Sequence, residues 1–538
     1  MKKRNILFTA AICSCLANMA QTPYMNENYM PTDLIGSARY VGMGGALGAL
    51  GADMSAISSN PAAIGLFRKS DVSTTLSVLT QGNKPDLDAD MTHLSFDQLG
   101  FVFSTPVRGE TLKYFNIGIN YQKKANFNHS FIADNHHTNG LSQSMQMADL
   151  LNNTQYSTPL ADLMYNACLV NPYLYAVDND NNILSDKDGK PIVEEYDAFN
   201  ANANQYDRTV EGSVWSYDFN LSVNLKDRIY LGLTFGVDNV DYYDYSTYSE
   251  YFTGADGLRE LYSLYNTRKV DGYGLNVKLG AIVRPIENSP FRIGLAIESP
   301  TVYRLDYSST YSVDSPMSED ENGDILYGDF VNHRPEHDLS TLSMKITTPW
   351  KVRVSLGHTI DKYLALGAEY EYANYSKTKQ GYLDWSYDDW YGEWYTGNTT
   401  RDPSMNKMHR STLKGVHSFK FGMELNVTDN VAVRVGYNYF SSMFNKGAVL
   451  DQTGDSPAFG YQTTTDYMNK GDVNLFTVGL GYRGKHFYAD LAYKYRMQSG
   501  DFYAFDDTYI ATSESGRLTP VNVDMNTHQV FCTLGYKF

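Results

Sequence analysis

Cysteines, prolines and basic residues are all few in this chain of 538 residues. Its four cysteines, Cys13, Cys15, Cys168 and Cys532, form no disulfide framework and no CxxC metal pattern. After residue 20 no stretch reaches the roughly 18 consecutive apolar residues that a transmembrane helix requires. Basic residues number 44 against 61 acidic ones and form no cluster along the sequence, which argues against nucleic acid as a partner.

Tyrosine and glycine, by contrast, are abundant, with 44 and 42 residues, and they favour strands and turns over helices. The formal charge is -17 and the mean hydropathy is -0.40, values that on their own indicate a soluble protein. A barrel that meets lipid with only every second strand residue would have the same low average. The pattern of strands must therefore decide the class.

Residues 1–20 are predicted to be an export signal. Three basic residues precede an apolar run over 6–17, which is too short to span a bilayer. Cleavage is expected after Ala20, and a lipid anchor at Cys15 is disfavoured because the residues before it match a lipobox poorly. An exported chain without a transmembrane helix is periplasmic, secreted or an outer-membrane barrel.

Fourteen stretches of about ten to twelve residues alternate between apolar and polar side chains, the length that a tilted strand needs to cross a bilayer. In residues 214–225, for example, Phe219, Leu221 and Val223 fall on one face of a strand and Asn220 on the other. The fourteen candidates start near residues 71, 97, 112, 214, 228, 272, 290, 347, 363, 415, 430, 472, 486 and 527.

The connections between these stretches alternate strictly between short turns and long polar loops. The short turns at 226–227 and 427–429, for example, are followed by the long loops 240–271 and 441–471. Short periplasmic turns opposite long external loops are typical of outer-membrane barrels. We therefore predict an all-β chain, a transmembrane antiparallel β-barrel of about 14 strands with long extracellular loops, in the outer membrane of a Gram-negative bacterium.

The last residues alternate up to a terminal Phe538, which resembles the C-terminal signal read by outer-membrane insertion machinery. That machinery and outer-membrane lipid are therefore expected partners. Charged residues of both signs, among them Glu298, Arg353 and Lys420, fall on the polar face of the strands. We expect them to pair across strands inside the barrel.

A glycine-rich segment without strand alternation precedes the first strand. It contains residues 37–46 (SARYVGMGGA), then 51–53 (GAD) and the Asn-Pro-Ala motif at 60–62. The segment resembles the plug of the FadL/TodX family of outer-membrane transporters for hydrophobic compounds, in which a Gly/Ala-rich stretch and an acidic residue precede Asn-Pro-Ala. The family's fourteen strands equal the number counted above. The resemblance implies three parts, which are a signal peptide over 1–20, a plug inside the lumen over 21–70 and the barrel over 71–538.

The resemblance also implies a function, the passive uptake of hydrophobic molecules that enter a site inside the barrel and leave sideways through its wall when the plug shifts. Fatty-acid-like, aromatic and haem-like molecules are all candidate cargo, and the family pattern suggests a monomer. Two alternatives stay open, a barrel that binds partner proteins or assists secretion, and a plain porin. The plug or gate residues implied are Gly42, Gly44, Gly45, Asp53, Asn60, Pro61 and Ala62. A simpler interpretation of the last three is a turn that only starts the first strand.

The long loop after the third strand contains an unusual apolar stretch at 141–166. Methionine-rich faces adapt to varied apolar partners. A short helix here either contributes to an external ligand groove or packs the loop onto the barrel mouth. Residues 258–265 resemble a second short helix with the same two interpretations. The groove candidates are Met145, Met147, Leu150, Leu151, Leu163 and Met164.

Other sites are not favoured by the sequence. The acidic run at 178–188 lacks the glycine that an EF-hand requires, and the paired histidines at 136–137 and at 333 and 337 have no partner pattern for metal or haem. No GxSxG motif is present. We therefore expect no metal, no cofactor and no enzymatic activity.

Overall fold

The computed structural model describes residues 22–538 apart from short gaps. No helix of this described part is long and apolar enough to cross a bilayer. The predicted signal at 1–20 lies outside the described residues. The gaps fall at 31–32, 84, 88, 154–157, 179–180, 187–188, 255–256, 320–324, 339–341, 389–392, 452–455, 457–461 and 514–515, and only the backbone is described at 319, 329–338, 384–388 and 393–398.

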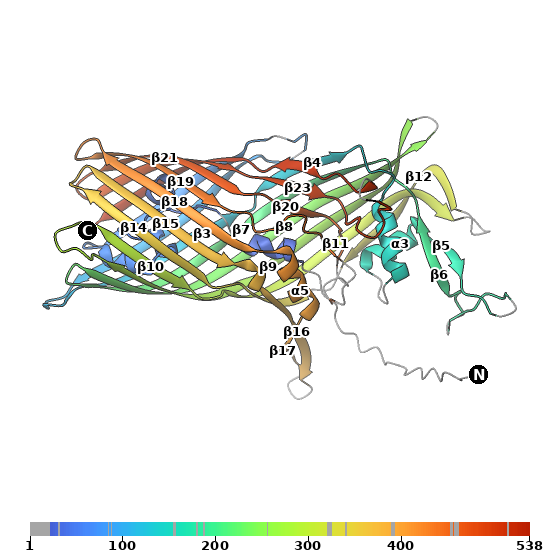
Figure 1. The fold of residues 1–538 in the computed structure, drawn as a ribbon, viewed down its shortest axis with the longest axis horizontal. Coiled ribbons are helices and arrows are strands. Elements are labelled where there is room, and N and C mark those ends of the chain that lie inside the picture. Colours follow the sequence, from blue (N-terminus) through green and yellow to red (C-terminus); the bar gives the residue numbers. More distant parts are fainter. Residues whose placement is uncertain are drawn as a thin grey trace.

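Fourteen antiparallel strands form the wall of a closed barrel (Figure 1). Each wall strand pairs with the next, and the ring closes where the last strand pairs with the first. Each overlaps one of the fourteen predicted stretches, so the predicted fold class is confirmed. The wall strands are β1 (Asp71–Gln81), β2 (Thr92–Pro106), β3 (Leu112–Asn126), β7 (Ala203–Leu225), β8 (Ile229–Gly254), β9 (Gly257–Val283), β10 (Arg292–Glu298), β14 (Lys351–Ile360), β15 (Leu364–Asn374), β18 (Gly415–Asn426), β19 (Val431–Phe440), β21 (Val473–Arg483), β22 (Phe487–Met497) and β25 (Thr527–Lys537).

The barrel is apolar outside and polar inside, the reverse of a soluble protein. Phe219 on β7, Leu279 on β9 and Phe421 on β18 point outward and are 48%, 52% and 52% exposed. Their inward neighbours are polar and buried, as Asp218 and Asn220 on β7 show. A continuous apolar belt of this kind is stable only against lipid, so the wall spans a membrane.

On the side of the long connections, several strands continue well beyond the lipid-facing belt. β8 and β9 stay paired from Ile229 opposite Val283 up to Gly254 opposite Gly257, with one register shift. Residues 258–265, expected as a short helix, lie within β9, so that prediction was wrong. Its leucines have helical spacing, but pairing with the neighbouring strands overrides this local preference.

A cover of helices and strands lies over the extracellular end of the barrel, the end far from the C-terminus in Figure 1. Its helices α3 (Gln143–Asn153) and α4 (Pro159–Asn166) pack against the hairpin of β5 (Val170–Tyr175) and β6 (Val193–Ala198). The remaining extracellular elements are β4 (His129–Asn135), β11 (Val302–Glu319), β12 (Ile325–Asp338), β13 (Leu342–Thr347), η4 (Tyr375–Lys377), β16 (Lys379–Asp388), β17 (Glu393–Arg401), α5 (Pro403–Thr412), β20 (Tyr467–Lys470), β23 (Ser499–Tyr503) and β24 (Val521–Asp524).

Short helices of the N-terminal segment fill the bore inside this wall (Figure 1). The first wall strand begins directly after them, at Asp71. The plug elements are α1 (Pro23–Asn26), η1 (Glu27–Tyr29), α2 (Ala38–Gly42), η2 (Met54–Ser58) and η3 (Pro61–Leu66).

Candidate functional site

The Asn-Pro-Ala motif begins η3, the last plug helix. Asn60 caps this helix, because its Oδ1 accepts a hydrogen bond from the backbone N–H of Ala62 at 3.0 Å. The carbonyl oxygen of Pro61 accepts hydrogen bonds from Asn220 Nδ2 at 3.1 Å and from Ser222 Oγ at 3.0 Å. Both donors lie on β7, so the motif starts a helix and also attaches the plug to the wall.

Glycines on the next two strands leave room for this motif. A Cβ added at Gly232 of β8 would overlap the backbone of Pro61, and one at Gly280 of β9 would overlap Oδ1 of Asn60. The side-chain amide of Asn60 donates to the carbonyl of Ala281 at 3.3 Å. The motif therefore fits a pocket built by three neighbouring strands.

The predicted glycines of the plug lie farther round the wall than this motif. Gly44 and Gly45 adopt φ values of +59° and +78°, in the left-handed region that favours glycine. The plug backbone over residues 43–50 runs along four inward-facing glycines that lie opposite one another on adjacent strands. A Cβ on most of these would overlap the plug backbone. We call them the glycine row: Gly357 on β14, Gly367 on β15, Gly422 on β18 and Gly436 on β19.

Asp53, the predicted acidic residue of the plug, holds two plug helices together. It caps η2 by accepting from the backbone N–H of Ser55 at 2.9 Å, and both of its carboxylate oxygens accept from Ser37 Oγ at 2.8 Å. Next to this cap, Arg39 forms an ion pair with Glu424 of β18 at 2.9 Å. The structure thus brings every predicted plug residue into one unit that is attached to the wall.

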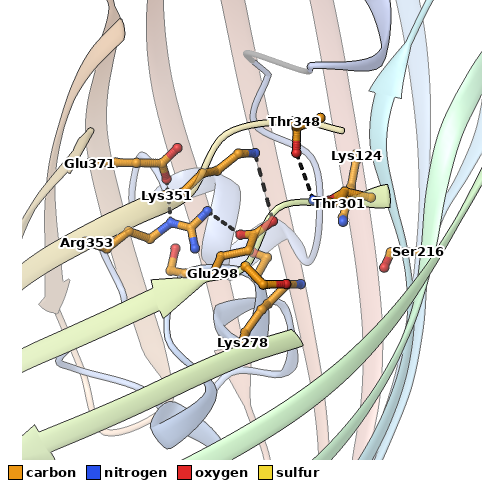
Figure 2. A network of polar contacts seen from close by, with 12 residues as sticks. Lys124, Ser216, Lys278, Glu298, Thr301, Thr348, Lys351, Arg353 and Glu371 are labelled. Carbon is orange, nitrogen blue, oxygen red and sulfur yellow. Dashed lines mark hydrogen bonds and ion pairs between the residues drawn. The ribbon is translucent and has the colours of Figure 1, made fainter. Parts of the chain in front are cut away.

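Charged side chains inside the barrel form a paired network beside the plug, which confirms the expected pairing across strands. Figure 2 shows its centre, where Arg353 Nη2 lies 2.8 Å from Glu298 Oε2 and Arg353 Nε lies 2.5 Å from Glu371 Oε2. Lys351 approaches the same Glu298 at 4.0 Å. Because these charges are buried, each requires its partner to remain ionised, and the network rigidifies this level of the lumen.

A partly open cavity of about 210 Å³ lies between the plug and the extracellular part of the wall. Residues of α1 and η1 form one side of it, and strands of the wall extension form the other. Aromatic and methionine side chains give it an apolar body. These are Tyr24, Met25, Phe127, Phe131, Tyr242, Tyr307, Tyr467, Met468 and Met525.

The cavity also contains buried polar groups. Arg208 forms an ion pair with Asp466 at 2.6 Å, and Lys470 forms one with Glu27 at 2.5 Å. Arg496, in contrast, donates to Gln498 Oε1 at 2.5 Å and has no carboxylate within ion-pair distance among the described residues.

Three polar atoms around the cavity, His129 Nε2, Arg208 Nε and Gln462 Oε1, are buried and have no hydrogen-bond partner in the described part of the chain. Burial, together with the nearby Arg496 and Lys470, lowers the pKa of His129 to about 4, so its ring is neutral near pH 7. Buried polar groups in proteins normally have partners. The cavity therefore offers free polar contacts to a molecule that enters it.

The residues expected to form an external groove lie inside the cover instead of on its surface. Their side chains pack with those of Tyr248, Tyr262 and Phe502. None of them is among the residues that line the cavity. Met147, Leu150, Leu163 and Met164 are buried at 0%, 4%, 3% and 0% exposure, and Met145 and Leu151 are partly buried against them.

The described residues contain no group of three or more His, Cys, Asp or Glu that could hold a metal ion. His136 and His137 are exposed. The side chains of His333 and His337 lie outside the described part of the chain, as do Asp180 and Asp188 of the acidic run.

The sequence analysis did not identify the cavity or the glycine row. The row had a visible signal, since each of its glycines occupies a polar-face position of a predicted strand. Glycine is unfavourable within a strand and often marks a place where another backbone approaches closely. The cavity had no such signal, because its lining comes from segments scattered between residues 22 and 527.

No protein-family model matches this chain, and no curated protein matches it. Among solved structures it is similar to a FadL homologue of Pseudomonas aeruginosa, with 14% identity, a TM-score of 0.48, and 94% of this chain and 99% of that chain covered. The toluene transporter TbuX of Ralstonia pickettii gives 13% identity, a TM-score of 0.44 and coverage of 94% and 98%. The toluene transporter TodX of P. putida gives 12% identity and a TM-score of 0.44, with 94% of this chain and 99% of that chain covered. Likeness of this degree does not assign a ligand to the chain.

Proposed function

We propose that this protein is an outer-membrane transport protein that takes up hydrophobic small molecules passively through its plugged barrel and releases them sideways through the wall. It would act as a monomer without catalysis. The observation that carries the proposal is the largely apolar cavity between the plug and the wall. A filled bore suits such cargo, because molecules that partition poorly into water gain little from an open aqueous pore.

The lining of the cavity favours cargo with an apolar body and one polar end. Tyr24, Phe131 and Met468 provide apolar contact, while Arg496 provides a cationic donor at the side of the lining. Of the three expected ligand classes, a long-chain fatty acid combines these properties best. A neutral monoaromatic molecule would leave the free polar atoms without partners, at a cost of about 1–3 kcal/mol for each group.

Ligand binding by the purified full chain tests this proposal. We expect saturable binding of a fluorescent long-chain fatty acid, with competition by haem and by toluene ranking the three classes. Val210→Trp would fill the cavity and should weaken this binding at least tenfold. The matched control is Val427→Trp, because Val427 is 59% exposed in a periplasmic turn.

Absence of saturable binding for all three probes would refute the transport proposal, as would equal binding by the two tryptophan variants. The alternative role as a partner-binding barrel predicts stable co-purification with other envelope proteins and no small molecule in the extracted protein. Mass spectrometry of the purified sample measures both.

A further inference from the structure

Six basic side chains from residues 377–414 meet on the outer surface of the barrel at α5. Lys407 and Arg410 are exposed on the outer face of this helix, and Lys414 follows directly after its end. The spacing of three residues places Lys407 and Arg410 on one side of the helix. Lys377 and Lys379 flank the start of β16, and Arg401 ends β17. We call Lys377, Lys379, Arg401, Lys407, Arg410 and Lys414 the α5 basic surface.

Backbone contacts hold these segments together. The N–H of Tyr375 in η4 donates to the carbonyl of Lys414 at 3.2 Å. Gly381 of β16 lies opposite Arg401 of β17. On its inner side α5 is fixed by Asn406, whose Oδ1 accepts from the N–H of Gln380 at 2.9 Å. The basic surface is therefore a fixed feature of the fold.

The charge of this surface is unbalanced, although the whole chain carries -17. None of its six side chains has an ion-pair partner among the described residues. Residues 375–383 contain no acidic side chain, and residues 399–416 contain only Asp402, which is buried as the cap of α5. Asp384 follows on β16, and Asp388 and Glu393 lie at the far end of the β16–β17 hairpin, which projects away from the wall (Figure 1).

The position of the surface along the barrel axis identifies what faces it. His417 of β18 and Tyr372 of β15 form part of the aromatic girdle at the extracellular edge of the lipid-facing belt, with ring centroids 5.0 Å apart. Lys414 precedes His417 by three residues, which corresponds to about 10 Å along a strand. That distance reaches the headgroup layer of the outer leaflet.

We propose that the α5 basic surface binds the phosphate groups of a phosphorylated glycolipid in the outer leaflet. Lysine and arginine at a membrane surface bind anionic headgroups, and arginine matches phosphate with paired hydrogen bonds. The acyl chains of the same lipid would lie along the apolar belt directly below, past Phe419 and Phe421. This site is on the outside of the wall and does not depend on the transport proposal.

Native mass spectrometry of the full chain with diphosphorylated lipid A tests the proposal. In the variant Lys407→Gln/Arg410→Gln/Lys414→Gln we expect at least a tenfold loss of lipid A affinity. The charge-preserving variant Lys407→Arg/Arg410→Lys/Lys414→Arg should retain binding. The matched control removes three exposed basic residues from periplasmic turns, Arg108→Gln/Lys362→Gln/Lys485→Gln, and should bind like the unmodified protein.

Two further measurements distinguish a site for the lipid headgroup from a site for free phosphate. Lipid A without its phosphates should bind at least tenfold more weakly, and millimolar inorganic phosphate should fail to displace intact lipid A. Equal affinity for the phosphorylated and dephosphorylated lipids would overturn the proposal, and so would equal losses in the α5 and control variants. Displacement by inorganic phosphate would also overturn it, because it would identify a site for free phosphate.

Discussion

At the scale of single residues, the plug fits against the wall because the wall has glycines where a side chain would overlap the plug. Asn60, Pro61 and Ala62 were recognisable in the sequence, because the motif stands between a glycine-rich segment and the first strand. Gly232 and Gly280, which make room for it, were not recognisable, because the partner of each lies some 170 to 220 residues away in sequence. A strand glycine on its own does not reveal which distant backbone it faces.

Gly232→Ala tests this attachment. The added methyl group overlaps the backbone of Pro61, which cannot move aside as a flexible side chain would. Overpacking of this kind costs about 1–3 kcal/mol. We expect the plug to detach more often, so that ion conductance of the protein in a planar bilayer rises by about fivefold or more.

Gly118→Ala is the matched control, since it also faces inward but its added Cβ has no neighbour closer than 3.5 Å. It should conduct like the unmodified protein. Equal conductance of the two variants would show that the close contact at Gly232 does not hold the plug.

At the scale of elements, strands were predictable where they meet lipid and not above it. Within the belt, one face of each strand is apolar and the other polar, so the period of two is strong. Above the belt the outer face meets water while the inner face of β8 carries both Tyr248 and Glu250, and the alternation fades. The long loop expected at 240–271 is therefore mostly paired strand.

Glu250 links the cover to this strand extension and makes the link sensitive to pH. Its Oε1 accepts from the N–H of Gln143, the first residue of α3, and from Tyr248 Oη, each at 2.5 Å. Burial raises the pKa of Glu250 from 4.5 to about 7. The folded cover therefore favours the protonated carboxyl, and this stabilisation is full below pH 4.5 and is lost as the pH rises through 7.

Amide hydrogen exchange of α3, corrected for intrinsic rates, should accordingly show weaker protection at pH 8 than at pH 5. The expected difference is up to about 3 kcal/mol. In Glu250→Gln, which keeps an acceptor for Gln143 but does not titrate, the difference should disappear. An unchanged pH dependence in this variant would place its origin in another group.

At the scale of the whole molecule, the alternation of short and long connections predicted both the closed barrel and its orientation. The length of each connection indicates which side of the membrane it occupies, so fourteen strands provide many weak indications that agree. The cavity could not be predicted in this way, because its lining comes from eight or more separate segments that meet only after the ring has closed. The α5 basic surface escaped prediction for a different reason, because its six side chains come together only when the connection between β15 and β18 folds.

Phe538 provides a test of how the whole barrel is assembled. Its ring is 54% exposed and stacks on Phe101 of β2 with centroids 6.1 Å apart. We expect Phe538→Ala to slow insertion by purified outer-membrane insertion machinery severalfold, while refolding in detergent stays unchanged. Phe487→Ala removes a ring that is 71% exposed beside Tyr536 and serves as the control. Slower refolding of Phe538→Ala in detergent as well would assign the residue a structural role only.

The joint between β1 and β25 has a consequence for the order of assembly. Thr533 of β25 accepts a hydrogen bond from the backbone N–H of Ala38 at 2.7 Å and shares another with Thr75 of β1 at 2.7 Å. The hydroxyl of Thr533 thus connects the last strand, β25, with the first strand, β1, and with the plug. Closure of the barrel and docking of the plug therefore stabilise each other at this residue, because each orients the hydroxyl that the other uses.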